Sequence, residues 1–222
     1  MNQAGTTYRR GQVEWALWQF FTLSRLASNE PPKVFLTRIK RLLEADRTDK
    51  VPAGQHYQPD SDFAFSSTKT EGQGVDATFS AFDAFCLALA LDLLDVGLKP
   101  SETVFLLRYL RTALAVEFKA ILRDPPPPPS QRPAKDKRVF WVIQKVELTE
   151  IYEQAPPRRK GHKTPIFLEP KFCRGADALM AELGEMNTER WGYRKALVVE
   201  IAYLADNLTK LLGKAPLKKR GR

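Results

Sequence analysis

Residues 79–108 constrain the fold most, because they predict a capped helix that ends at a glycine and is followed by a second helix. Ser80 is placed to accept a hydrogen bond from the backbone N–H of Asp83, and Asp83 adds negative charge where the helix dipole favours it. Gly97 is expected to end the helix, because glycine is able to adopt a positive φ. The helix is too short and too interrupted, by Asp92 and Asp95 among others, to span a membrane. Apolar side chains cover nearly its whole circumference, which predicts a buried central helix: Phe85, Leu87, Leu89, Leu91, Leu93 and Leu94.

Two helices are predicted upstream of this core helix. The first covers 8–21 and carries an apolar stripe at helical spacing, formed by Val13, Leu17, Phe20 and Phe21. The second begins after Pro31 and Pro32, since proline is tolerated in a first turn, and covers 33–47. Its expected inward residues are Phe35, Ile39, Leu42 and Leu43. Its expected outer face carries Lys33, Thr37, Arg38, Lys40 and Arg41, a composition that fits a major groove or, alternatively, a solvated surface.

The order of these elements resembles the DNA-binding domain of the MerR family of transcriptional regulators. In that family a helix-turn-helix and a small β wing precede an aromatic-Ser-x-x-Asp helix start, a Leu-rich helix, a glycine and a second helix. The corresponding residues here are Phe79, Ser80, Asp83 and the segment 97–102. The resemblance covers the first half of the chain and implies a winged helix-turn-helix that binds duplex DNA as a homodimer. The chain departs from the pattern at 23–32, where the connection is longer than the usual turn of about three or four residues.

In this resemblance the wing falls within 48–78, a segment rich in Pro and Gly. Residues 63–69 alternate weakly as a strand, and Lys69 would contact a phosphate. The residues that we expect to bind DNA lie in the first two helices and in the wing: Arg9, Arg10, Lys33, Thr37, Arg38, Lys40, Arg41, Arg47 and Lys69.

A proline run after Asp124 predicts a stiff linker and a second domain. Beyond it, 138–152 reads as a strand, 164–169 as its hairpin partner, 177–184 as a short helix and 189–212 as a long helix. The long helix carries a stripe that would pack on the hairpin or form a dimer seam: Leu197, Ile201, Leu204, Leu208 and Leu211. A second candidate seam lies before the linker, at Leu107, Leu110, Leu114 and Ile121.

These elements predict an α+β protein with four parts. A mostly helical winged-helix domain covers 1–123, a Pro-rich linker 124–137, a domain with a β-hairpin plus helices 138–213, and a basic tail 214–222. The chain has 35 Lys and Arg against 26 Asp and Glu, a net charge of +9, which favours an anionic partner. The excess gathers in the first two helices, in 158–163 and in the tail, which suggests several contacts with a polyanion.

The residues that could carry catalysis are few. His56 and His162 lie in predicted loops without nearby ligand partners, so we expect no enzyme, metal or cofactor. Cys86 is expected in the core, and Cys173, between Lys171 and Arg174, could have a lowered pKa. No secretory signal begins the sequence, which favours a cytoplasmic protein.

The sequence therefore predicts a DNA-binding transcriptional regulator whose operator and small-molecule effector it does not specify. The alternatives are a protein-interaction or ligand-sensing module with an incidental basic surface, and a nonspecific nucleic-acid-binding protein.

Overall fold

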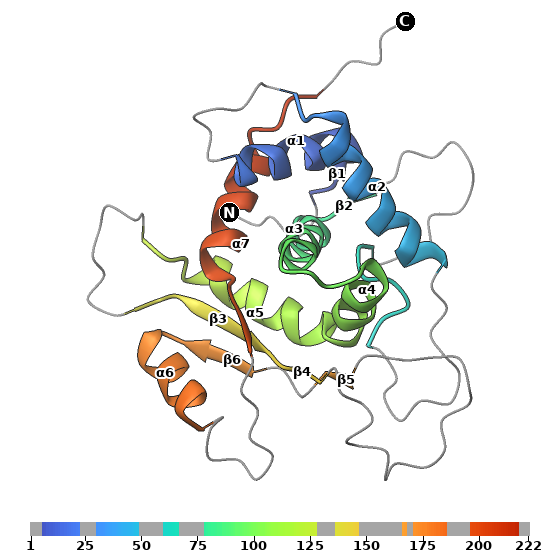
Figure 1. The fold of residues 1–222 in the computed structure, drawn as a ribbon. Helices are drawn as coiled ribbons and strands as arrows, with labels where there is room; N and C mark the ends of the chain where they lie inside the picture. Colours follow the sequence, from blue (N-terminus) through green and yellow to red (C-terminus); the bar gives the residue numbers. More distant parts are fainter. Residues whose placement is uncertain are drawn as a thin grey trace, which may run out of the picture. The chain divides into compact units, whose positions relative to one another are not determined.

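The computed structural model describes residues 6–22, 30–48, 60–66, 78–127, 136–146, 166–167, 171–185 and 196–217. The chain mixes helices and strands, so the predicted α+β class is confirmed. It divides into two compact units (Figure 1). Unit 1 combines 1–123 with 204–222, and unit 2 covers 124–203. No helix in these described ranges is long and apolar enough to cross a membrane.

The centre of unit 1 is helix α3 (Ala81–Asp95), as predicted. The Ser80 hydroxyl caps it by accepting from the Asp83 N–H at 3.0 Å, and the Asp83 carboxylate accepts from the Ser80 N–H at 2.8 Å. At the other end Gly97 takes φ +95°, which lets its N–H reach the Leu94 carbonyl and the Leu98 N–H reach Leu93. Both end signals are therefore confirmed, and they combine into a capping box and a Schellman turn.

Five helices of unit 1 surround α3, whose axis points toward the viewer in Figure 1. They are α1 (Arg10–Phe21), α2 (Lys33–Thr48), α4 (Pro100–Tyr109), α5 (Arg111–Arg123) and, from Leu204 onward, α7 (Ala202–Leu212). Short strands β1 (Tyr8–Arg9) and β2 (Thr78–Phe79) pair antiparallel where α1 and α3 begin. Tyr8 and Phe79, which are both buried, lie opposite each other in this pairing, so the starts of two distant helices are fixed to each other.

The second helix follows its prediction closely, whereas the first begins at Arg10 because Tyr8 and Arg9 form β1. On α1, Val13 and Leu17 are buried while Phe20 and Phe21 are half-buried. On α2, Ile39 and Leu42 are buried, Phe35 and Leu43 are half-buried, and the predicted polar outer face is exposed. The two helices meet through aromatic rings, with Trp18 and Phe35 in an edge contact at 5.3 Å between centroids. Amphipathic spacing was sufficient to orient α2.

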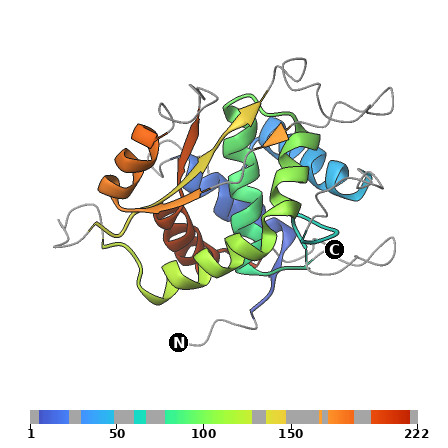
Figure 2. The same cartoon turned by 90° about the horizontal axis from the view of Figure 1, so that it is seen from below.

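Unit 2 contains a three-stranded antiparallel sheet in the order β6-β3-β7, with helix α6 (Ala176–Glu185) beside it (Figure 2). Strand β3 (Val139–Ile143) is central, between β6 (Lys171–Arg174) and β7 (Leu197–Glu200). Phe140, Val142 and Cys173 form a small apolar cluster, and Leu179 of α6 packs against it. The adjacent β4 (Lys145–Val146) and β5 (Ile166–Phe167) pair antiparallel, which confirms the predicted hairpin at these residues. The earlier part of the predicted strand, β3, pairs with β6 and β7 instead, so there the prediction was wrong.

Two helix predictions were wrong. The candidate seam at Leu107, Leu110, Leu114 and Ile121 does not lie on one helix, because the chain breaks at Leu110 (φ −103°, ψ 5°) into α4 and α5. The long helix expected over 189–212 begins only at Ala202, because Leu197–Glu200 is a strand paired with β3. The run of Leu and Val in this strand favours a sheet. The four-residue spacing from Leu197 to Ile201 is also typical of a helical stripe, which is why a helix was predicted there.

The residues proposed as dimer seams are mostly buried within the single chain. Those fully covered are Leu107, Leu110, Leu114, Ile121, Ile201, Leu204 and Leu208. Leu197 lies on a strand, so the second seam is not one helical stripe. A homodimer would therefore need a different surface or a rearranged core.

Candidate nucleic-acid interface

The exposed face of α2 gathers most of the residues predicted to bind DNA. Its exposed residues include Lys33, Thr37, Arg38, Lys40, Arg41 and Arg47. Glu44 is the one acidic residue of the helix that reaches this side, and it pairs with Lys40 at 3.5 Å. We call the set Lys33, Arg38, Lys40, Arg41 and Arg47 the α2 basic face. It presents several cations on one side of a sixteen-residue helix.

Not every polar group on this face is free to contact a ligand. The Thr37 hydroxyl donates to the Lys33 carbonyl at 2.8 Å, a bond along its own helix. Among the described residues, Arg38 and Arg41 have no ion-pair partner. The same holds for Lys33 and Arg47 among the described residues, so four exposed cations of α2 remain available to bind an anion.

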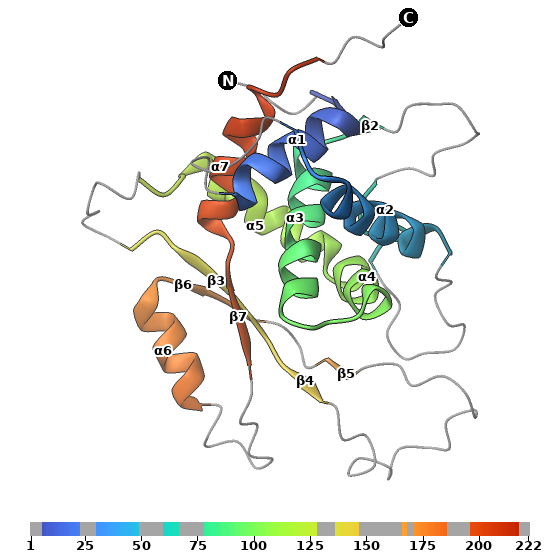
Figure 3. The ribbon, with the colours of Figure 1, turned by 45° about the horizontal axis from the view of Figure 1, so that its top comes forward.

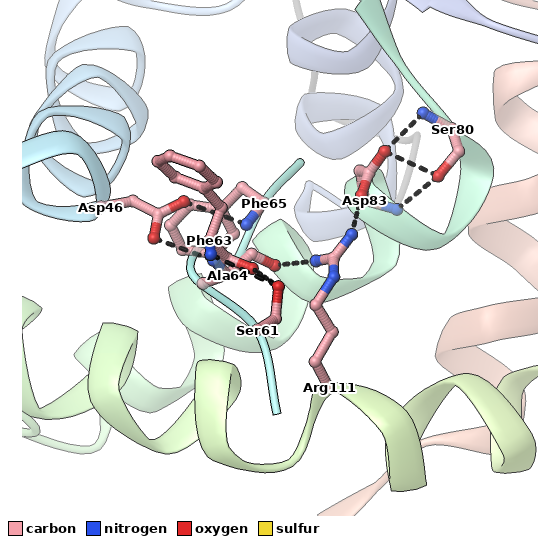
Figure 4. Close-up of polar contacts among 8 residues, drawn as sticks. All are labelled: Asp46, Ser61, Phe63, Ala64, Phe65, Ser80, Asp83 and Arg111. Carbon is pink, nitrogen blue, oxygen red and sulfur yellow. Dashed lines mark hydrogen bonds and ion pairs between the residues drawn. The ribbon is translucent and has the colours of Figure 1, made fainter. Parts of the chain in front are cut away.

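The opposite side of α2 is held by a buried carboxylate, Asp46. Its two oxygens accept from the backbone N–H groups of Ala64 at 2.8 Å and Phe65 at 3.1 Å (Figure 4). The Arg108 Nε donates to the same carboxylate at 2.9 Å, and another Arg108 nitrogen donates to the Asp46 carbonyl. Because the Asp46 and Arg108 side chains are each only 5% exposed, the pair is shielded from solvent.

A second buried pair, Arg111 with Asp83, continues this network to α3. Arg111 donates to an Asp83 oxygen and to the Ala64 carbonyl, and its guanidinium lies 5.1 Å from the centre of the Phe82 ring. The other Asp83 oxygen accepts from the N–H and the hydroxyl of Ser80. Figure 4 shows the segment 61–65 lying between Asp46 and the Arg111–Asp83 pair. One short segment thus links α2, α3 and α5.

The segment 60–66 is not the start of a wing strand. Residues 63–66, the described part of the predicted strand, form a turn in which the Ser61 hydroxyl accepts from the Phe63 N–H at 3.3 Å. Ala64 and Phe65 are buried, so their backbone groups are paired with Asp46 and Arg111 instead of with a neighbouring strand. Lys69 lies outside the described residues.

We call the two pairs and segment 60–66 the buried clamp. Buried charges are tolerated only when they are paired and fully hydrogen-bonded. The Asp46 carboxylate meets that condition with bonds from three residues. Since Asp46 and the α2 basic face lie on opposite sides of one helix, the clamp fixes which way the cations point.

Two further predicted residues lie away from α2. Arg9 is exposed in β1, and Arg10 begins α1, where its side chain pairs with Glu14 at 2.7 Å. The sequence-based interpretation did not identify the clamp. An acid at the inward position 46, four residues after Leu42, was the available signal that a buried cation would be needed.

The cysteines are not set up for reactivity. Burial raises the pKa of Cys86 to about 12. Burial, assisted by the negative charge of Glu182, also raises the pKa of Cys173, and the opposing effect of Lys171 is smaller. The suggestion of a lowered Cys173 pKa was therefore wrong. Cys86 lies in the core of α3, as predicted. Within the described ranges, no group of three or more His, Cys, Asp or Glu residues is arranged to hold a metal.

Comparisons of this chain with known protein families, with curated proteins and with solved structures find no match.

Proposed function

We propose that this protein binds double-stranded DNA through the α2 basic face and regulates transcription. The observation that carries the proposal is the exposure of Lys33, Arg38, Lys40, Arg41 and Arg47 on one helix whose other side is clamped. A helix that exposes cations on one face, and whose opposite face is held by the buried clamp, has the features needed to contact phosphates and base edges. The net charge of +9 favours the same partner.

The remaining parts of the proposal come from the resemblance to MerR-like regulators. They are a winged-helix arrangement of the first helices, a homodimer on a palindromic operator and a cytoplasmic location. Catalysis and cofactors are not part of it. Two half-sites one helical turn apart would each receive one α2 helix.

The test is fluorescence anisotropy with labelled duplexes of random sequence, measured over a series of salt concentrations. The variant Arg38→Ala/Arg41→Ala removes two exposed cations from α2. If both contact phosphates, the slope of log K against log salt should become shallower by roughly 2, since each contact contributes about 0.9. If one reads a base, selected sequences should lose about 1–3 kcal/mol of discrimination.

The matched control is Lys119→Ala/Arg123→Ala. It removes two exposed cations of α5 that lie four residues apart. The control should retain the parent slope. Equal losses in both variants would indicate a nonspecific effect of net charge and would favour a nonspecific nucleic-acid-binding protein. Parent-like binding by the α2 variant would remove this helix as the DNA contact.

A further inference from the structure

The side chain of Gln12 joins two segments of unit 1 that are far apart in the sequence. Its Oε1 accepts from the backbone N–H of Arg9 at 3.1 Å, and its Nε2 donates to the carbonyl of Ala215 at 3.3 Å. Turning the amide over would place like groups against each other at both ends. The two bonds therefore require the same orientation of one amide, which makes Gln12 a bridge between the start of α1 and the segment after α7.

This bridge brings exposed cations of the two segments to one place. Arg9 and Lys214 are both exposed, and Lys214 directly precedes the bridged Ala215. Lys214 is itself fixed, because its N–H donates to the Leu211 carbonyl at 3.0 Å in the last turn of α7. Figure 3 shows the segment after α7 running past the beginning of α1. We call Arg9 and Lys214, with their Gln12 bridge, the Arg9–Lys214 patch.

The charge around this patch is predominantly positive. The N-terminal end of α1 adds the partial positive charge of the helix dipole. Glu14 pairs with Arg10, so its negative charge is already neutralised. The sequence just beyond the patch continues with Lys218, Lys219, Arg220 and Arg222. Lys218 follows Ala215 by three residues, a reach of at most about 10 Å of extended chain.

We propose that the Arg9–Lys214 patch is a second, sequence-independent contact for the phosphate backbone of duplex DNA. This inference rests on the proposed function, and it joins Arg9, which the sequence already predicted to bind DNA, to a cation of the segment after α7. Charge complementarity selects the ligand, since a duplex carries one negative charge per about 1.7 Å of its axis. The cations lie at a strand end and a turn instead of on a protruding helix, which suits phosphates more than base edges.

The experiment measures anisotropy of random and selected duplexes over a salt series with Arg9→Ala/Lys214→Ala, using Lys119→Ala/Arg123→Ala as the matched control. The patch variant should lose roughly 2 from the salt slope and bind all sequences more weakly, with an unchanged ratio of specific to nonspecific affinity. Gln12→Met removes both bridging bonds without changing charge. It should weaken binding to every duplex while the α-helical circular dichroism signal stays intact.

The variants separate this inference from the proposed function. A parent-like slope for Arg9→Ala/Lys214→Ala, together with loss of binding in Arg38→Ala/Arg41→Ala, overturns the patch and leaves the α2 interface standing. The reverse result supports the patch and overturns α2. Loss of binding to phosphatidylglycerol vesicles but not to duplexes in the patch variant overturns the inference in favour of a membrane surface.

Discussion

Replacing Asp46 with alanine should destabilise unit 1 strongly, because it takes the carboxylate away from a buried cation. Arg108 is only 5% exposed at its side chain and loses its carboxylate. The N–H groups of Ala64 and Phe65 lose their acceptors in the same step. The substitution therefore removes the charge that compensates a guanidinium and two backbone bonds that hold segment 60–66.

The expected loss is about 3–5 kcal/mol, the range for breaking a buried ion pair by removing one partner. The free-energy cost of leaving the two N–H groups without acceptors belongs to the same local rearrangement, so it is not added separately to this loss. Domains of this size are stable by about 5–15 kcal/mol, so the variant should lose a large part of its free energy of unfolding. The double variant Asp46→Ala/Arg108→Met should be no less stable than Asp46→Ala alone, because it removes the uncompensated charge.

Urea unfolding followed by circular dichroism at 222 nm measures these free energies by linear extrapolation. The matched control is Asp206→Ala, which removes a carboxylate whose partner, Lys210, has a 60% exposed side chain. Water solvates that lysine, so the control should lose less than about 1 kcal/mol. A loss below about 1 kcal/mol for Asp46→Ala, or strictly additive losses in the double variant, would refute the reasoning about the buried clamp.

Two substitutions and one labelling reaction test separate features of unit 1 and the thiols. Burial, with the nearby Asp95, raises the pKa of Asp92 to about 6, so this carboxyl favours folding when protonated and its contribution is lost as pH rises from about 4 to about 6. Asp92→Asn should therefore gain about 1 kcal/mol at pH 7 and nothing at pH 4 in urea unfolding, whereas an equal effect at both values would contradict the shifted pKa. Ser80→Ala should lose about 1 kcal/mol through the lost cap, measured by thermal unfolding, and a stability equal to the parent would show that the cap contributes nothing. The thiols of Cys86 and Cys173 should react with a disulfide reagent at pH 8 only after urea is added, and rapid reaction of the native protein would contradict their burial.

Local signals in the sequence were sufficient for the helices of unit 1 that begin or end with strong caps. For α3, the Ser80 cap and the Gly97 turn each involve residues within a few positions, so propensity and capping identify them directly. The faces of α2 followed from the same local reasoning, because Ile39 and Leu42 recur at helical spacing.

Features that depend on distant partners could not be predicted in this way. The clamp joins Asp46 with Arg108, which lie 62 residues apart, and periodicity carries no information about such a pairing. Strand β6 is four residues long, too short for an alternating pattern to separate it from a loop. The central β3 is buried at every position, so it also lacks the alternation by which half-buried strands are recognised.

Unit 1 is formed by two separate stretches of the sequence, and this has a consequence for synthesis on the ribosome. Residues 124–203 are made after the first part of unit 1 and before its closing helix segment, which begins at Leu204. At about 5–20 residues per second, the growing chain spends roughly 4–16 s extending this insertion. During that time α7 has not yet been made, and α3 is apolar on nearly every side. The nascent chain therefore exposes an incomplete core. Pausing within the insertion should lengthen the exposure, and chaperone binding to stalled chains should peak there and fall once α7 has emerged.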